Sequence, residues 1–237
     1  MSTVYLLAFV VYPYLAIAIF FGGHGYRYMT DLYHWNSSSS ELLEKKNLWY
    51  GITLFHWGII FTFLGHFFGL LTPQRLLDRV GISASFHEMV SIYTGMLFGT
   101  LALIGLIILL WRRVGIRRIA ATSTPSDLIV VVLLLIVVAL GTYNTYFKRF
   151  DVVGVIAPWI RGIVILHPRP ELMVPVPLSY KAHILVALGL IAYSPFTRLV
   201  HIWSAPVQYL GRKYVVFRTR QPVLAPPFGN TSGSSGT

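Results

Sequence analysis

The chain has 237 residues, of which 55% are hydrophobic and only 11% are charged, and its mean hydropathy is +0.66. This composition excludes an ordinary soluble domain and indicates a protein that resides in a lipid bilayer. The formal net charge of +11 does not call for nucleic acid as a partner, because basic residues at helix ends contact anionic lipid head groups.

Four uncharged runs are each long enough to cross roughly 30 Å of hydrocarbon as a helix. They lie at about 3–26, 48–74, 89–111 and 128–147. The first run lacks the basic region and the cleavage site of a signal peptide, so we expect it to remain as a helix. A fifth span is predicted from Ser179 to about Trp203, with Lys181 and Arg198 near its ends, where long side chains reach the interface.

The predicted fold is all-α, an integral membrane bundle of five transmembrane helices over residues 1–215, followed by a flexible cytoplasmic tail at 216–237. The stretch 150–166 is also largely apolar. Because Pro158 and Arg161 lie in its middle, we expect an interfacial or loop segment there.

Most of the Lys and Arg residues gather in three segments that such a bundle would place on one side of the plasma membrane. They are Arg27, Lys45, Lys46, Arg112, Arg113, Arg117, Arg118, Arg198, Arg212, Lys213, Arg218 and Arg220. Since positive charge favours the cytoplasmic side, the amino terminus is predicted outside and the carboxyl terminus in the cytoplasm.

Four histidines lie inside the predicted spans: His56 and His66 in the second, His183 and His201 towards opposite ends of the fifth. An imidazole in lipid is disfavoured unless it has a partner. In a continuous helix, the 18 positions from His183 to His201 make five whole turns and roughly 27 Å, so both rings share a face. His56 and His66 are 10 positions apart, about 80° around the helix and roughly 15 Å along it.

The second and fifth spans run in opposite directions, which pairs His56 with His201 near the cytoplasm and His66 with His183 near the exterior. Each pair can give two axial nitrogens to one haem iron, leaving no open position for oxygen. Without any cysteine, iron–sulfur clusters and covalent haem attachment are excluded, so we predict two non-covalent haem b groups. The two axial spacings differ by about 12 Å, which helix tilt and a kink at Pro195 would have to absorb.

Ordinary interhelical hydrogen bonding or a proton path is the alternative role for these four histidines. The small residues Gly58, Gly65, Gly69 and Gly189 leave room for flat macrocycles or for close helix approach. Interface or surface roles are predicted for the remaining histidines of the loops and helix ends, His24, His34 and His167.

Two segments, FHWGIIFTFLGHFFGLLTP (55–73) and SPFTRLVHIWSAPVQYLGRKY (194–214), resemble the gamma subunit of respiratory nitrate reductase, a five-helix di-haem cytochrome b. The resemblance covers about residues 1–215. It implies that His56 and His201 bind the haem next to an iron–sulfur subunit and that His66 and His183 bind the distal haem. It further implies that quinol is oxidised near the distal haem and that electrons continue to the iron–sulfur subunit and a molybdenum subunit.

The family resembled has a lysine important for quinol just before the third helix, where this chain has Phe86, His87 and Glu88. An imidazole and a carboxylate can accept quinol protons, so His87 and Glu88 are candidates for the quinol site. Solvated residues at a helix start, where Glu is favoured by the helix dipole, are the alternative. We also expect the extramembrane subunit to contact Tyr209, Arg212, Lys213 and Tyr214.

Three other functions compete with this interpretation. A transporter or channel is disfavoured because the predicted spans contain no Asp or Glu and no repeated half. A purely structural membrane anchor leaves the four intramembrane imidazoles unexplained. Within the haem interpretation, the alternative is the di-haem membrane subunit of a related iron–sulfur reductase of sulfur or heterodisulfide metabolism.

Overall fold

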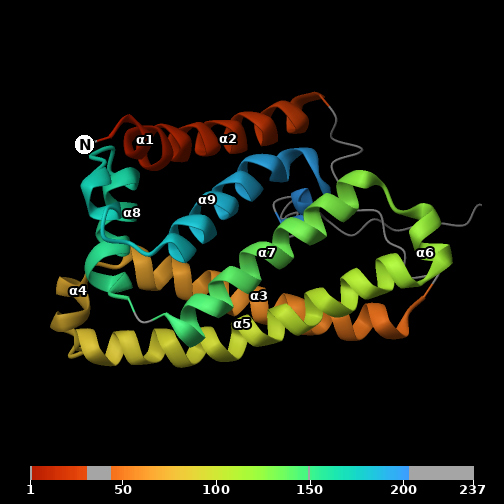
Figure 1. Ribbon diagram of the computed structural model, residues 1–237, viewed down its shortest axis with the longest axis horizontal. Helices are drawn as coiled ribbons and strands as arrows, with labels where there is room; N and C mark the ends of the chain where they lie inside the picture. The colour runs from red at the N-terminus through yellow and green to blue at the C-terminus, as the bar shows by residue number, and fades with distance from the viewer. Residues whose placement is uncertain (1, 31–43, 149, 203–237) are drawn as a thin grey trace, which may run out of the picture. The chain divides into compact units, whose positions relative to one another are not determined.

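The computed structural model describes residues 2–30, 44–148 and 150–202, which belong to the compact unit Met1–Ser204 (Figure 1). All regular structure in these ranges is helical, as predicted. The expected boundary at residue 215, the tail, His34 and the expected subunit contacts Tyr209, Arg212, Lys213 and Tyr214 lie outside the described residues.

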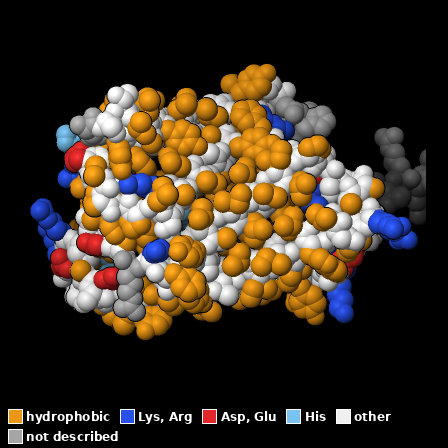
Figure 2. Space-filling model, in the orientation of Figure 1, with side chains coloured by type: hydrophobic (Ala, Val, Ile, Leu, Met, Phe, Trp, Pro, Cys, Tyr) orange, Lys and Arg blue, Asp and Glu red, His pale blue; other side chains and the backbone are white. Residues whose placement is uncertain are grey.

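Four helical segments are long and apolar enough to cross a membrane, which confirms the first four predicted spans. They are Thr3–Thr30 (α1, Thr3–Leu6; η1, Leu7–Val11; α2, Tyr12–Thr30), α3 (Lys46–Leu71), α5 (Ala84–Gly115) and α7 (Pro125–Phe147). Hydrophobic side chains cover the middle of the face drawn in Figure 2, and most of its charged side chains lie towards the two ends. Apolar exposure of this kind fits helices that face lipid, so the protein is a multi-pass membrane protein.

The fifth predicted span is not one continuous helix. α9 (Leu178–Tyr193) has 16 residues, about 24 Å, and ends before Pro195. Pro195 has no N–H to donate to the carbonyl of Ile191, four residues earlier. The Ser194 hydroxyl donates to that carbonyl instead, at 2.7 Å. The chain continues as two 3₁₀ segments, η5 (Ser194–Phe196) and η6 (Arg198–Ile202). The kink predicted at Pro195 is therefore confirmed, and the roughly 27 Å between His183 and His201 that holds for a continuous helix does not apply.

The long helices α3, α5, α7 and α9 pack one on the next in chain order, and α2, from the start of the chain, packs on α9 (Figure 1). The α3–α5 contact is close because Gly58 and Gly105 lack a Cβ: one on Gly58 would collide with the backbone of Ala102, and one on Gly105 with the backbone of Phe55. Gly58 therefore serves helix approach. Short helices connect the long ones, α4 (Gln74–Arg79) and α6 (Arg117–Thr122).

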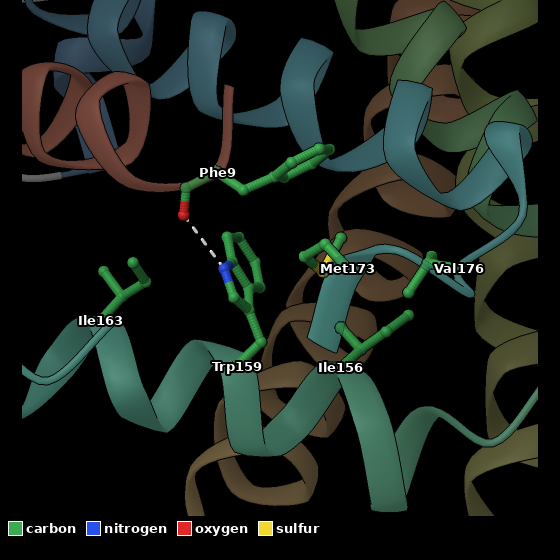
Figure 3. Packing of buried hydrophobic residues seen from close by; sticks show 6 residues of the cluster. All are labelled: Phe9, Ile156, Trp159, Ile163, Met173 and Val176. Atoms are coloured by element: carbon green, nitrogen blue, oxygen red, sulfur yellow. Dashed lines mark hydrogen bonds between the residues drawn. The ribbon is translucent and has the colours of Figure 1, made fainter. Parts of the chain in front are cut away.

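The apolar stretch after α7 folds as the short helices η3 (Val152–Ile156) and α8 (Ala157–Val164), followed by η4 (Pro170–Met173). Its buried side chains form a core with Phe9, and Figure 3 shows the Trp159 ring pointing at that residue. Pro13 has no N–H to donate to the Phe9 carbonyl four residues earlier, and the Trp159 Nε1 donates to it at 3.1 Å. The segment is thus a short packed helix, consistent with the interfacial placement.

Candidate functional site

The four histidines of the predicted spans come together in two pairs. The ring centroids of His56 and His201 are 6.0 Å apart, and those of His66 and His183 are 6.2 Å apart. Each pair joins α3 to the α9–η6 segment, so the sequence-based pairing matches the neighbours in space. The break at Pro195 lies between His183 and His201, and the ring of His201 beyond it lies beside that of His56.

Both separations suit a metal ion held between two imidazoles. An iron about 2 Å from one nitrogen of each ring separates the two ring centroids by roughly 6 Å, because each centroid lies about 1 Å behind its nitrogen. Among the described residues, no group of three or more His, Cys, Asp or Glu side chains could hold a metal ion. Two facing imidazoles occupy two positions of a six-coordinate iron, an arrangement that suits a haem, whose macrocycle supplies the other four ligands.

The Nδ1 atom of each of the four rings lies within hydrogen-bond distance of a backbone carbonyl oxygen. The acceptors are Ile52 for His56 (2.9 Å), Thr62 for His66 (2.8 Å), Val137 for His183 (2.9 Å) and Arg198 for His201 (2.7 Å). A carbonyl oxygen only accepts, so Nδ1 carries the proton and the lone pair is on Nε2. This is the arrangement in which a backbone partner fixes the ring and leaves the other nitrogen for a metal.

Glycines beside the pairs differ in role. A Cβ built on Gly65, next to His66, meets nothing within 4 Å among the surrounding atoms, whereas one on Gly141 of α7 would lie 3.0 Å from the His183 ring. Gly141 therefore allows His183 to approach the α7 backbone. A Cβ on Gly189 would lie 2.8 Å from the Tyr12 hydroxyl, so Gly189 serves packing against α2.

Charged side chains form two clusters at the end of the bundle that holds His56 and His201. The Arg112 Nε donates to the Glu44 carboxylate at 2.8 Å, and the Arg112 side chain is only 3% exposed. The Asp127 carboxylate accepts from Arg198 at 2.6 Å and from Arg113 at 3.0 Å. The pKa of Glu44 is lowered, first by the hydrogen bond from the Asn47 N–H and then by the Arg112 guanidinium.

The candidate quinol residues lie near the other end of α3. The His87 Nδ1 is 3.2 Å from the Gln74 Oε1, and its Nε2 is 3.5 Å from a Cβ built on Gly69. His87 is half-buried against α3 and α4, whereas Glu88 is exposed. Adjacent residues on a helix point about 100° apart, so the two side chains do not face the same space.

Nearby, the Arg161 Nη1 donates to the carbonyl oxygen of Leu70, four residues beyond His66, at 3.0 Å. Burial and then the neighbouring Arg169 lower the pKa of Arg161. This bond fastens α8 to the end of α3. His167 is exposed in the loop after α8, and the His24 Nδ1 is 2.9 Å from the Phe20 carbonyl of its own helix.

Comparison with known proteins gives the chain its family. Residues 5–220 match the family model described as nitrate reductase gamma subunit. The chain is 43% identical over 214 residues to the nitrate reductase gamma chain of Bacillus subtilis (strain 168), covering 89% of this chain and 96% of that protein. The chain belongs to the nitrate reductase gamma subunit family. It is a membrane subunit of a respiratory nitrate reductase complex, in which other subunits are its partners.

Two further relatives are similar to this chain at lower sequence identity. The respiratory nitrate reductase 1 gamma chain of Escherichia coli (strain K12) is 35% identical over 217 residues, covering 90% of this chain and 96% of that one. The Hdr-like menaquinol oxidoreductase cytochrome b-like subunit of Archaeoglobus profundus is 23% identical over 176 residues, covering 70% of this chain and 51% of that one.

Three residues that shape the site were not singled out from the sequence: Asp127, Gln74 and Gly141. Asp127 was detectable, since the run Thr124-Pro-Ser-Asp127 has the spacing of a capping box, and the structure shows that box. Gln74 and Gly141 give no local signal, because their roles come from contacts with residues distant in the chain.

Proposed function

We propose that the chain is the quinol-oxidising cytochrome b subunit of its nitrate reductase, holding one haem b between His56 and His201 and a second between His66 and His183. Electrons from quinol would leave through these haems to an iron–sulfur subunit and reach a molybdenum subunit. The observation that carries the proposal is that both imidazole pairs have ring separations suited to one iron and Nδ1 atoms on carbonyl oxygens. Haem iron with two imidazole ligands carries single electrons and has no open position for oxygen.

The residues of the chain hold and orient the proposed groups. Each imidazole is fixed by a backbone carbonyl rather than by a mobile side chain, which limits rotation of the ring and favours binding through Nε2. At the depth of a membrane span, a bare imidazole is costly, and a bound iron supplies the partner it lacks. These two points favour haem binding over the proton path and the plain membrane anchor.

The orientation we propose places the His56–His201 pair towards the cytoplasm. Arg112, Arg113 and Arg198 lie at that end of the bundle, and short cytoplasmic connections carry an excess of positive charge. The amino terminus would then lie outside and the carboxyl terminus inside the plasma membrane. The iron–sulfur subunit would meet the cytoplasmic end, next to the His56–His201 haem.

For quinol, we propose a site at the outer end of α3, in which His87 accepts a proton. Gln74 orients the His87 ring through Nδ1, and the Gln74 amide is itself held by the Asp78 carboxylate at 2.8 Å and the Ile82 carbonyl at 3.0 Å. This leaves Nε2 of His87 as the acceptor towards α3. Glu88 would have a secondary role, because its side chain is exposed and does not face the same space.

Spectroscopy of the purified complex tests the proposal. We expect two non-covalent haems per gamma subunit, extracted by acid acetone, with the reduced absorption bands of six-coordinate low-spin haem b. Alanine substitution of any of the four paired histidines should remove one haem, whereas the matched His167→Ala variant, in the exposed outer loop, should retain both. One haem in the unaltered protein, or a high-spin spectrum, would contradict the two-pair arrangement.

The more distant relative adds support for the quinol part of this proposal. It is named as a menaquinol oxidoreductase cytochrome b-like subunit, so a protein of related sequence is associated with quinol oxidation. Identification of the copurifying subunits tests the proposed partners. An iron–sulfur subunit and a molybdenum subunit would support them, and their absence from the purified complex would contradict them.

A further inference from the structure

One carboxylate, that of Asp127, joins three elements at the end of the bundle that holds His56 and His201. It lies in the first turn of α7, and its side chain is 11% exposed. Its Oδ1 accepts from the Arg198 Nε at 2.6 Å, and its Oδ2 accepts from the Arg113 Nη1 at 3.0 Å. The Thr124 N–H also donates to Oδ2, at 3.1 Å. Three donors therefore converge on two oxygens.

Arg198 connects this carboxylate to His201. The backbone carbonyl of Arg198 accepts the hydrogen bond of His201 Nδ1 at 2.7 Å, so the residue held by Asp127 is also the residue that orients the imidazole. Leu199, between them in sequence, is buried in a cluster with Val130 and Leu190. Asp127 and Val130 are three residues apart on α7 and lie on one side of that helix, so both secure η6.

The segment needs such an anchor because it is not part of a long helix. η6 has five residues, follows the break at Pro195 and is 3₁₀ in geometry, which is less stable than an α-helix. His56, by contrast, lies in the middle of the 26-residue α3 and is oriented by its own helix through Ile52. The two members of this pair therefore differ in what fixes them.

We propose that Asp127 is a positioning residue for His201: its carboxylate holds the Arg198 guanidinium, and the Arg198 carbonyl then sets the orientation of the His201 ring. The inference rests on the proposed function only in that His201 binds haem. Asp127 is negatively charged and two guanidiniums face it, so the three groups form a charge-assisted network rather than a single surface ion pair. Loss of one partner would release η6 and with it one axial ligand.

The test uses the intact complex in native membranes and resolves the two haems by redox titration and by their low-spin ferric signals. In Asp127→Asn, one amide oxygen replaces two carboxylate oxygens, so at least one of the three donors loses its acceptor. Arg198→Lys keeps the charge but not the planar donor that meets Oδ1. We expect both variants to lower the haem affinity of the His56–His201 site by roughly 10- to 100-fold, and therefore its occupancy, while the His66–His183 site is unchanged.

Matched controls separate positioning from other effects. Thr124→Ala removes the reciprocal half of the capping box but leaves both ion pairs, and Glu44→Gln alters the other charged cluster of the same end. Both should retain the His56–His201 haem. Asp127→Glu, which restores the charge, should recover most of the occupancy lost in Asp127→Asn.

The outcomes are distinct. Full occupancy and an unchanged signal of the His56–His201 site in both Asp127→Asn and Arg198→Lys would overturn the positioning role while leaving the proposed function intact. Equal loss of both haems in these variants would show a general folding defect and would also overturn it. Absence of two low-spin haems from the unaltered complex would instead contradict the proposed function itself.

Discussion

The Nδ1 of His183 lies 2.9 Å from the carbonyl oxygen of Val137, so this ring is oriented from a neighbouring helix rather than from its own. The rings of His56 and His66 bond to carbonyls four residues earlier in α3, and that of His201 to a carbonyl three residues earlier. The interhelical bond is possible because residue 141, one turn beyond Val137 on α7, is glycine.

Gly141→Ala is therefore expected to disturb the His66–His183 site selectively. The added methyl would lie 3.0 Å from the His183 ring, which must shift by a few tenths of an ångström and weaken its bond to Val137. Overpacking costs about 1–3 kcal/mol, partly offset by the better helix propensity of alanine, about 1 kcal/mol. We expect an altered signal and a shifted reduction potential of this haem, with the other haem unchanged.

Gly95→Ala is the matched control for this variant. Its methyl would meet the Thr145 side chain at 3.4 Å, an ordinary van der Waals contact, in the neighbouring α5–α7 interface. Both haem signals should then stay as in the unaltered protein. An equal change of both haems in Gly141→Ala would show that the helix packing, and not the His183 ring, had been altered.

Hydropathy and histidine spacing were sufficient to predict four of the spans and the two histidine neighbourhoods. In the fifth span the kink at Pro195 was also predictable, but the apolar composition continues through that proline and does not reveal that the α-helix ends there and gives way to two 3₁₀ segments. The axial spacings of the two histidine pairs appeared to disagree because the spacing in the fifth span was taken from a continuous helix. Hydropathy does not draw attention to Asp127, because it lies at a helix start, just before the uncharged run predicted from residue 128. Gly141 has no local signal, because its neighbour His183 is far away in sequence.

Trp159→Phe should destabilise the packing of α8 against the first span. The substitution keeps a large apolar ring but removes the Nε1 donor, leaving the Phe9 carbonyl without this partner next to Pro13. Loss of a hydrogen-bond partner from a buried group costs about 1–3 kcal/mol. Thermal unfolding of the protein in detergent should show a lower midpoint.

The control is Trp57→Phe, a change of the same kind at a side chain that is 58% exposed on α3. Its midpoint should stay close to that of the unaltered protein. If both tryptophan variants lose equal stability, the buried Trp159 hydrogen bond is not the cause.

Acid should weaken the start of α3 through Glu44. Its carboxylate accepts from the N–H groups of Asn47 at 2.8 Å and Leu48 at 3.3 Å, and it pairs with Arg112. Because these contacts lower the Glu44 pKa below its ordinary 4.5, the stability they provide is present above that value and is lost as pH falls through the lowered pKa.

The measurement is thermal unfolding of the unaltered protein and of Glu44→Gln from neutral pH to below pH 4.5. At neutral pH the unaltered protein should be the more stable, and the difference should shrink as the medium becomes acidic. A difference that grows towards acid would have the wrong sign for a carboxyl group whose pKa is lowered by folding, and would contradict the role given to Glu44.

The direction of electron flow follows from the proposed placement of quinol beside His87. Electrons that enter at the outer end must use the His66–His183 site before the His56–His201 site. His66→Ala or His183→Ala should therefore remove one haem and abolish quinol-dependent nitrate reduction, yet leave nitrate reduction with an artificial donor that reduces a partner subunit directly. His87→Ala should keep both haems and slow their reduction by quinol at least 10-fold, the usual contribution of a proton acceptor being about 10²–10⁴.

His56→Ala and His201→Ala separate this path from its reverse. Both should stop quinol-dependent nitrate reduction, but the His66–His183 haem should remain and still be reduced by a quinol analogue. The rate of haem reduction in a stopped-flow experiment distinguishes entry of electrons at the His66–His183 haem from entry at the His56–His201 haem. When one haem is removed, the remaining haem is reduced by quinol at the normal rate only if it is the haem nearest the quinol site. If the variants lacking the His66–His183 haem still reduce the remaining haem at the normal rate, quinol enters at the cytoplasmic end, and the role of His87 is wrong. Glu88→Gln provides the matched comparison, since its side chain is exposed and the rate should stay close to that of the unaltered protein.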